Sequence, residues 1–121
     1  MTRHWVLALF AGAAVVSAQV DYSRDVSRIM QAKCQQCHRP NDIAPFPLTN
    51  YEEVSTYADD IRRVVEARTM PPWKPVAGFN EFRDSFALTE EERAIILTWA
   101  AGGAHEGDRA DLPEPLPAKD S

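Results

Sequence analysis

The sequence has few of the residues that usually build metal, redox and disulfide sites. Its 121 residues include two cysteines, three histidines and three methionines. The cysteines are Cys34 and Cys37, and a zinc site of two Cys-x-x-Cys pairs is disfavoured because the second pair is missing. A redox disulfide of this spacing is expected in a βαβ context, which the sequence does not show. Both remain as the weaker interpretations of this cysteine pair.

Long hydrophobic runs are also missing. The longest apolar stretch is Val6–Val16, which follows Arg3 and is too short to span a bilayer comfortably. The small residues Val16-Ser17-Ala18 come next, so residues 1–18 are predicted to be a signal peptide cleaved after Ala18. We therefore expect an exported, periplasmic protein that is soluble after cleavage, with an uncleaved membrane anchor as the alternative.

Positive charge is scarce. Lys and Arg number 13 against 18 Asp and Glu, which gives a formal net charge of −5. This balance argues against nucleic acid or an anionic membrane surface as a partner, and it suits a soluble partner that carries a basic docking patch. The length predicts one domain, which we place at residues 19–108, followed by a Pro-rich acidic tail at 109–121.

The sequence is organised around the pentapeptide Cys34-Gln35-Gln36-Cys37-His38. In C-x-x-C-H, two thiols attach one haem covalently and the next residue ligates its iron. The cysteines must lie within about one helical turn because both thioethers form on one edge of the macrocycle. His38 then offers a neutral imidazole nitrogen to the iron. We therefore predict one haem c bound at Cys34, Cys37 and His38.

Hydrophobic periodicity predicts an all-α chain of three main helices, over 21–33, 50–68 and 90–101. Asp21 or Ser23 is expected to cap the first, and a capping box beginning at Thr89 starts the last. Three prolines keep 39–50 out of a helix. We expect Met30 in the core and Trp99 where the last helix meets the first.

Met70 is the predicted second iron ligand. It precedes Pro71-Pro72, so it is held in a stiff extended segment, and its thioether is a soft ligand suited to low-spin haem iron. The loop 39–50 spans at most about 40 Å, and a helix over 50–68 is roughly 27 Å long. The chain can therefore return Met70 to the haem face opposite His38. His105 is the weaker alternative for this position.

Three further residues are predicted to contact the haem or its ligand. A ligand histidine needs a fixed acceptor for its second ring nitrogen, and we expect the backbone carbonyl of Pro45. Arg68 is predicted to pair with a haem propionate, and Trp73 to donate its indole N–H to one. A surface role for Arg68 and a core role for Trp73 remain open.

The chain resembles the class I monohaem cytochrome c domain over about residues 21–108. The resemblance rests on C-Q-Q-C-H at the end of a first helix, a later loop methionine and a C-terminal helix. C-Q-Q-C-H-R-P, A-P-F, R-x-M-P-P-W and W-x-x-x-G-A resemble more narrowly a bacterial periplasmic subgroup, sometimes fused to thioredoxin-like or copper monooxygenase-like domains. It implies a small cytochrome c-like fold, thioether attachment at Cys34 and Cys37, and His38 and Met70 as ligands. The departure is a His-to-Met separation of only 32 residues.

These features predict a one-electron carrier rather than an enzyme. His/Met ligation fills both axial positions, so no small-molecule substrate is expected. The expected partners are membrane or periplasmic oxidoreductases, and the protein is expected to be a monomer. One alternative is a haem domain with a labile distal methionine, acting as a peroxidase or gas sensor. The other is the electron-entry subunit of a separate oxidase or monooxygenase.

Overall fold

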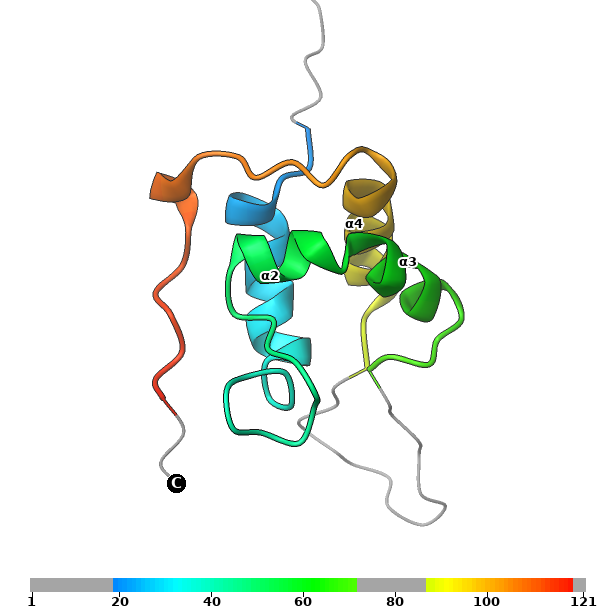
Figure 1. Cartoon of the computed structure of the whole chain (residues 1–121). Coiled ribbons are helices and arrows are strands. Elements are labelled where there is room, and N and C mark those ends of the chain that lie inside the picture. The colour runs from blue at the N-terminus through cyan, green and yellow to red at the C-terminus, as the bar shows by residue number, and fades with distance from the viewer. Residues whose placement is uncertain (1–18, 72–86, 119–121) are drawn as a thin grey trace, which may run out of the picture.

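The computed structural model describes residues 19–71 and 87–118. The predicted signal peptide, 1–18, and Trp73 lie outside these ranges. The described residues form helices and connecting segments without a strand, which confirms the all-α prediction for this part of the chain (Figure 1). The elements are η1 (Tyr22–Val26), α1 (Ser27–Ile29), η2 (Met30–Cys34), α2 (Tyr51–Thr56), α3 (Ala58–Glu66), α4 (Glu90–Ala101) and η3 (Arg109–Asp111). None of these helices is long and apolar enough to cross a bilayer.

The elements η1, α1 and η2 follow one another without a gap, and we call them together the N-terminal helix. Asp21 caps it, because its carboxylate accepts from the backbone N–H of Arg24 at 2.7 Å. One face of the helix carries Val26 and Met30, which are buried in the core. The last helical residue is Cys34, so the Cys-x-x-Cys-His motif begins at the end of the helix, as predicted.

The predicted helix over 50–68 is wrong in one respect, because it is interrupted at Tyr57. This residue has φ −102° and ψ 14°, outside the helical region, and it separates α2 from α3. The Tyr57 ring stacks on Phe46, with centroids 4.1 Å apart and planes at 15°. Phe46 belongs to the loop before α2, so the interruption lies where this loop packs against the helix pair. The apolar periodicity continues through the break, which is why the sequence pattern did not predict it.

Helix α4 begins and ends as the sequence predicts. Thr89 and Glu92 form a complete capping box, and Gly103 follows the helix at a φ of 100°. Trp99 is 1% exposed, lies 6.3 Å from Tyr22 between ring centroids, and donates its indole N–H to the carbonyl of His105 at 2.9 Å. The prediction that Trp99 packs where the last helix meets the first is therefore confirmed.

Replacing Trp99 with alanine is expected to destabilise the domain by about 3–5 kcal/mol, because large-to-small core substitutions leave a cavity. Trp99→Phe should cost less, since it keeps an aromatic ring and chiefly loses one hydrogen bond, worth about 1 kcal/mol. Urea unfolding of the two variants measures both values. Equal losses would mean that the indole N–H, rather than the packed ring, carries the stability.

Burial raises the pKa of Tyr22 to about 12, and Glu53 and Glu52 add to the effect. The unfolded tyrosine has its ordinary pKa of 10.0, so the unfolded state loses its phenol proton first as pH rises. We expect the free energy of unfolding to be unaffected by Tyr22 below pH 10 and to fall between pH 10 and 12. With solvent screening allowed for, the loss is on the order of 1–2 kcal/mol. Tyr22→Phe should remove this part of the pH dependence in urea unfolding.

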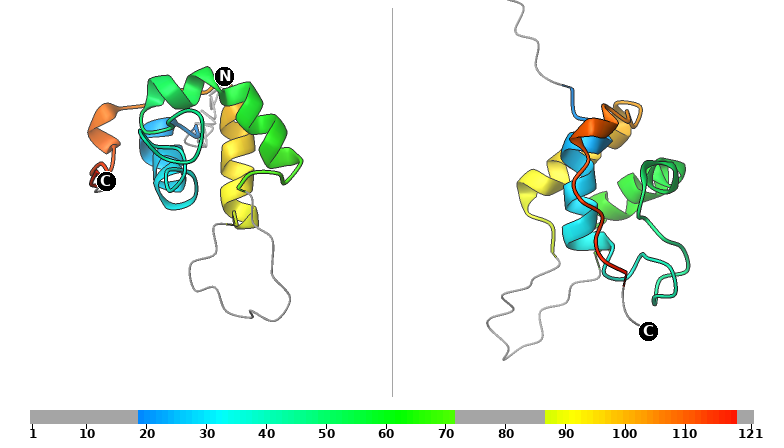
Figure 2. Two further views of the ribbon diagram at one scale, coloured as in Figure 1. Left: turned by 60° about the horizontal axis from the view of Figure 1, so that its bottom comes forward. Right: turned by 90° about the vertical axis from the view of Figure 1, so that its left-hand side faces the viewer.

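The C-terminal tail runs along the N-terminal helix (Figure 2). The Arg28 guanidinium donates to the carbonyl of Asp111 at 3.2 Å, and the Gln31 amide donates to that of Glu114 at 2.9 Å. Closer to the motif, Arg39 donates to the carbonyl of Pro117 at 3.4 Å. Arg28, Gln31 and Arg39 thus hold the backbone of residues 111–117, and this segment follows the extended path that the prolines favour.

Candidate haem site

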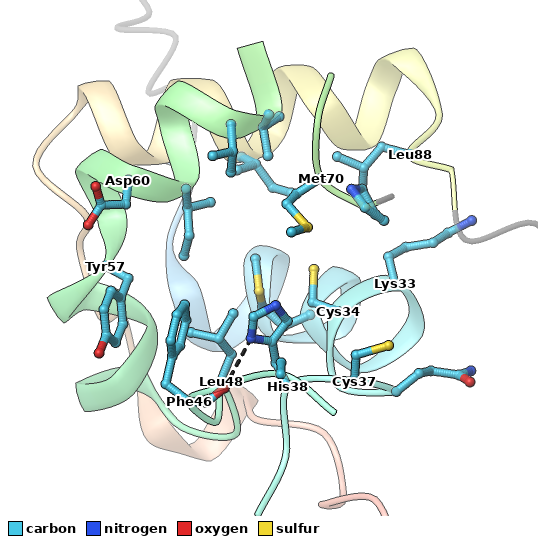
Figure 3. Close-up of a pocket in the computed structure, with 18 of the residues that line it drawn as sticks. Lys33, Cys34, Cys37, His38, Phe46, Leu48, Tyr57, Asp60, Met70 and Leu88 are labelled. Atoms are coloured by element: carbon cyan, nitrogen blue, oxygen red, sulfur yellow. Dashed lines mark hydrogen bonds between the residues drawn. The ribbon is translucent and has the colours of Figure 1, made fainter. Parts of the chain in front are cut away.

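A cavity of about 680 Å³ lies between the end of the N-terminal helix, the loop 39–50, α3 and the residues before α4 (Figure 3). This volume is within the roughly 300–1,000 Å³ of small-molecule and cofactor sites. Most of its lining is apolar, and that part consists of Met30, Ile43, Ala44, Pro45, Phe46, Leu48, Ile61, Val64, Val65, Met70, Pro71, Leu88 and Ile96. The same cavity is lined by Cys34, Cys37 and His38, so the structure brings the motif and Met70 to one site.

His38 is held by the loop that follows it. Its Nδ1 lies 3.0 Å from the carbonyl oxygen of Phe46, and because a carbonyl only accepts, Nδ1 carries the proton. In the neutral imidazole, this tautomer leaves the lone pair on the other ring nitrogen, Nε2, which is the form that ligates a metal. The predicted acceptor, Pro45, is wrong by one residue. Pro45 still lines the cavity, but the Phe46 carbonyl faces the imidazole.

Backbone hydrogen bonds fix this loop beneath the motif. Leu48 N–H donates to the carbonyl of His38 at 2.9 Å, and Ala44 N–H donates to that of Cys37 at 3.2 Å. The buried Gln35 side chain donates to the carbonyl of Leu48 at 3.0 Å. Three contacts therefore connect residues 35–38 with residues 44–48. They hold the Phe46 carbonyl in place and so set the orientation of the imidazole ring.

The two cysteines have different environments. Both are free thiols, with Cys34 partly buried and Cys37 exposed. Burial raises the pKa of the Cys34 thiol to about 12, and the charge of Glu92 and the neighbouring Cys37 add to the effect. Cys34 therefore stays a neutral thiol near neutral pH. A neutral thiol is not the form that a metal site needs, because metal sites use thiolate ligands.

Met70 lies across the cavity from His38, and its sulfur points into the space between them (Figure 3). Its side chain is 42% exposed, although methionine is usually a buried residue. The backbone N–H of Thr69 donates to the carbonyl of Val64 at 3.0 Å, which turns the chain back over the end of α3. Met70 is thus presented to the cavity by a segment that is anchored to the helix before it.

Two of the other predicted residues lie away from the cavity. The Arg68 guanidinium forms an ion pair with Glu90 at 3.0 Å and is absent from the lining. His105 is exposed, and its backbone carbonyl accepts from Trp99 and from the Tyr22 N–H. His105 is therefore not placed to reach the site in the way that Met70 is.

The structure adds contacts that the sequence pattern did not predict. Phe46 supplies the acceptor for His38 and packs its ring 4.9 Å from the imidazole, between ring centroids. Tyr57 stacks on Phe46 and also lines the cavity. Asp60 and Arg63 also line it, from α3. The sequence feature that could have pointed to this pair is its spacing, because residues 60 and 63 lie one helical turn apart on the same face.

The residues of this cavity fit a covalently attached haem. The space is large enough for a cofactor and mainly apolar, and two thiols stand at one side of it. The His38 imidazole, whose Nδ1 hydrogen-bonds to Phe46, faces the Met70 thioether across the space. Within residues 19–71 and 87–118, no three His, Cys, Asp or Glu side chains gather into a metal-binding group.

Comparison with known proteins identifies no relative. No family model matches the chain, and no curated protein or solved structure matches it significantly.

Proposed function

We propose that the protein is a periplasmic one-electron carrier with one covalently attached haem c. Cys34 and Cys37 are its attachment points, and His38 and Met70 are its axial iron ligands. The partners are membrane or periplasmic oxidoreductases, which a monomer meets through weak polar contacts. The observation that carries the proposal is the opposition of His38 and Met70 across one apolar cavity with both motif cysteines in its lining.

Each residue has a defined task in this proposal. The haem supplies an iron that takes up and releases one electron. The backbone carbonyl of Phe46 accepts a hydrogen bond from the Nδ1–H of His38, which would orient the imidazole and raise its basicity as a ligand. The Met70 thioether favours the reduced iron and so raises the reduction potential. The apolar walls exclude water, and the two fixed ligands limit rearrangement between the oxidation states.

The peroxidase and gas-sensor alternatives need an open iron position. Peroxidase chemistry also needs an acid–base group on the Met70 side of the site. On that side, the cavity lining from the described part of α3 is Asp60, Ile61, Arg63, Val64 and Val65. Arg63 and Asp60 are 72% and 63% exposed, whereas the buried part of this lining, Ile61 and Val65, is apolar, which favours the carrier over the peroxidase.

The optical spectrum of the protein produced with haem-attachment machinery tests the proposal. We expect a covalent low-spin haem with the weak red band of methionine-bound ferric iron, and no shift of the reduced protein with carbon monoxide. A high-spin spectrum that shifts with carbon monoxide would favour the peroxidase or gas sensor. Absence of covalent haem would return Cys34 and Cys37 to the disulfide interpretation.

A further inference from the structure

The two edges of a haem differ chemically, and the motif determines which edge faces which wall. Thioethers form on the edge that carries the vinyl groups, and the two propionates extend from the opposite edge. In Figure 3, Cys34 and Cys37 lie at one side of the cavity and Asp60 lies at the other. A haem attached to both cysteines therefore directs its propionates toward the wall formed by α3.

Arg63 is the arginine that α3 contributes to this wall. It lines the cavity, and one guanidinium nitrogen lies 3.1 Å from a carboxylate oxygen of Asp60. The two side chains are 72% and 63% exposed. An ion pair this exposed contributes only about 0.2–1 kcal/mol, so Arg63 can exchange Asp60 for another carboxylate at little cost. A planar guanidinium can also bind a carboxylate through two parallel hydrogen bonds.

We propose that Arg63 binds a haem propionate and that Asp60 offsets part of its charge there. This inference rests on the proposed haem-carrier function. It assigns to Arg63 the role that the sequence pattern suggested for Arg68, whose guanidinium pairs with Glu90 and does not line the cavity. Arg63 is a positioning residue, since it acts on the haem carboxylates and does not ligate the iron.

The charge of this pair acts on the iron. A cation beside the haem disfavours the ferric state, which carries one more positive charge than the ferrous state. Loss of the Arg63 charge therefore lowers the reduction potential, and loss of the Asp60 charge raises it. The surface location screens both effects, so each is expected to be a several-fold change in the ferric-to-ferrous equilibrium. A tenfold change corresponds to about 59 mV for one electron.

The experiment compares the reduction potentials of haem-loaded Arg63→Gln, Arg62→Gln and Arg68→Gln. Each variant removes one positive charge from an exposed side chain in or just after α3, and only Arg63 lines the cavity. We expect Arg63→Gln to lower the reduction potential, which corresponds to a several-fold shift of the equilibrium toward the ferric state. The two control variants should shift this equilibrium less than twofold. Arg63→Lys should restore most of the potential, because it restores the charge. Asp60→Asn should change the potential in the opposite direction.

The inference and the proposed function fail in different ways. If the wild-type protein carries a low-spin covalent haem but the three glutamine variants share one potential, Arg63 is only a surface partner of Asp60. If Arg68→Gln alone lowers the potential, Arg68 holds the propionate. If the wild-type protein attaches no haem, the proposed function fails and this inference with it. Thermal unfolding of each variant should match that of the wild type, which separates a change in potential from loss of the fold.

Discussion

Met70→Ala is expected to convert the low-spin haem protein into one with an open iron position. The weak red band of methionine-bound ferric iron should disappear, and the reduced protein should bind carbon monoxide. The reduction potential should fall, because the thioether that favours ferrous iron is removed. Axial ligands set haem potentials over roughly 0.8 V, so this shift should exceed that of any surface charge in the protein. Optical spectra with and without carbon monoxide, and a redox titration, measure the three effects.

Met30→Leu is the matched control, since Met30 is the other methionine in the cavity lining. Met30 is 1% exposed and packs in the core. A volume-conserving exchange there costs less than about 1.5 kcal/mol, so the haem spectrum should stay that of the wild type. If Met30→Leu loses the red band and Met70→Ala keeps it, the ligand is Met30. If both variants keep it, the second ligand is not methionine, and the His/Met assignment is wrong.

His38→Ala is expected to abolish the low-spin haem and to lower the yield of haem-loaded protein severely. His38 is the histidine of the cavity lining within the described residues. Its removal takes away the proximal ligand and also leaves the carbonyl of Phe46 without its imidazole donor. The measurement is the haem absorbance per polypeptide after export, followed by the spin state of whatever haem is attached.

His105→Ala is the control for this experiment. The His105 side chain is exposed, and its contacts with Trp99 and Tyr22 use the backbone carbonyl, which alanine retains. Haem content and spectrum should therefore equal those of the wild type. A loss of low-spin haem in His105→Ala, with Met70→Ala unchanged, would restore His105 as the second ligand.

Local sequence signals predicted much of the fold, because they act over a few residues. The Asp21 cap and the Thr89–Glu92 capping box depend on side chains within one helical turn of the backbone groups they bind. Gly103 has a positive φ, which is unfavourable for residues other than glycine, so the end of α4 could also be predicted from the sequence. The Cys-x-x-Cys-His motif is local in the same sense, since its spacing alone brings both thiols and the imidazole close together.

Features that depend on packing between distant segments were predicted less well. Tyr57 interrupts the expected helix where its ring stacks on Phe46, which lies in a different segment. The acceptor for His38 is one residue from the expected position, because the loop between Cys37 and Leu48 is shaped by three backbone and side-chain hydrogen bonds. A shift of one residue changes which carbonyl faces the ring, and the direction of a carbonyl in an irregular loop cannot be predicted from the sequence pattern.

The sequence by itself determined the helical class and the caps that begin the N-terminal helix and α4, because periodicity and caps are short-range properties. The haem chemistry of Cys34, Cys37 and His38 stays a prediction. Only the tertiary structure decided which residues surround the cavity. In the tertiary structure, Met70 lies opposite His38, and Arg63 rather than Arg68 lines the cavity. The Phe46 carbonyl is the acceptor for the imidazole. These outcomes depend on how α3 and the loop 39–50 pack against the N-terminal helix. That packing is the sum of contacts between residues far apart in the chain.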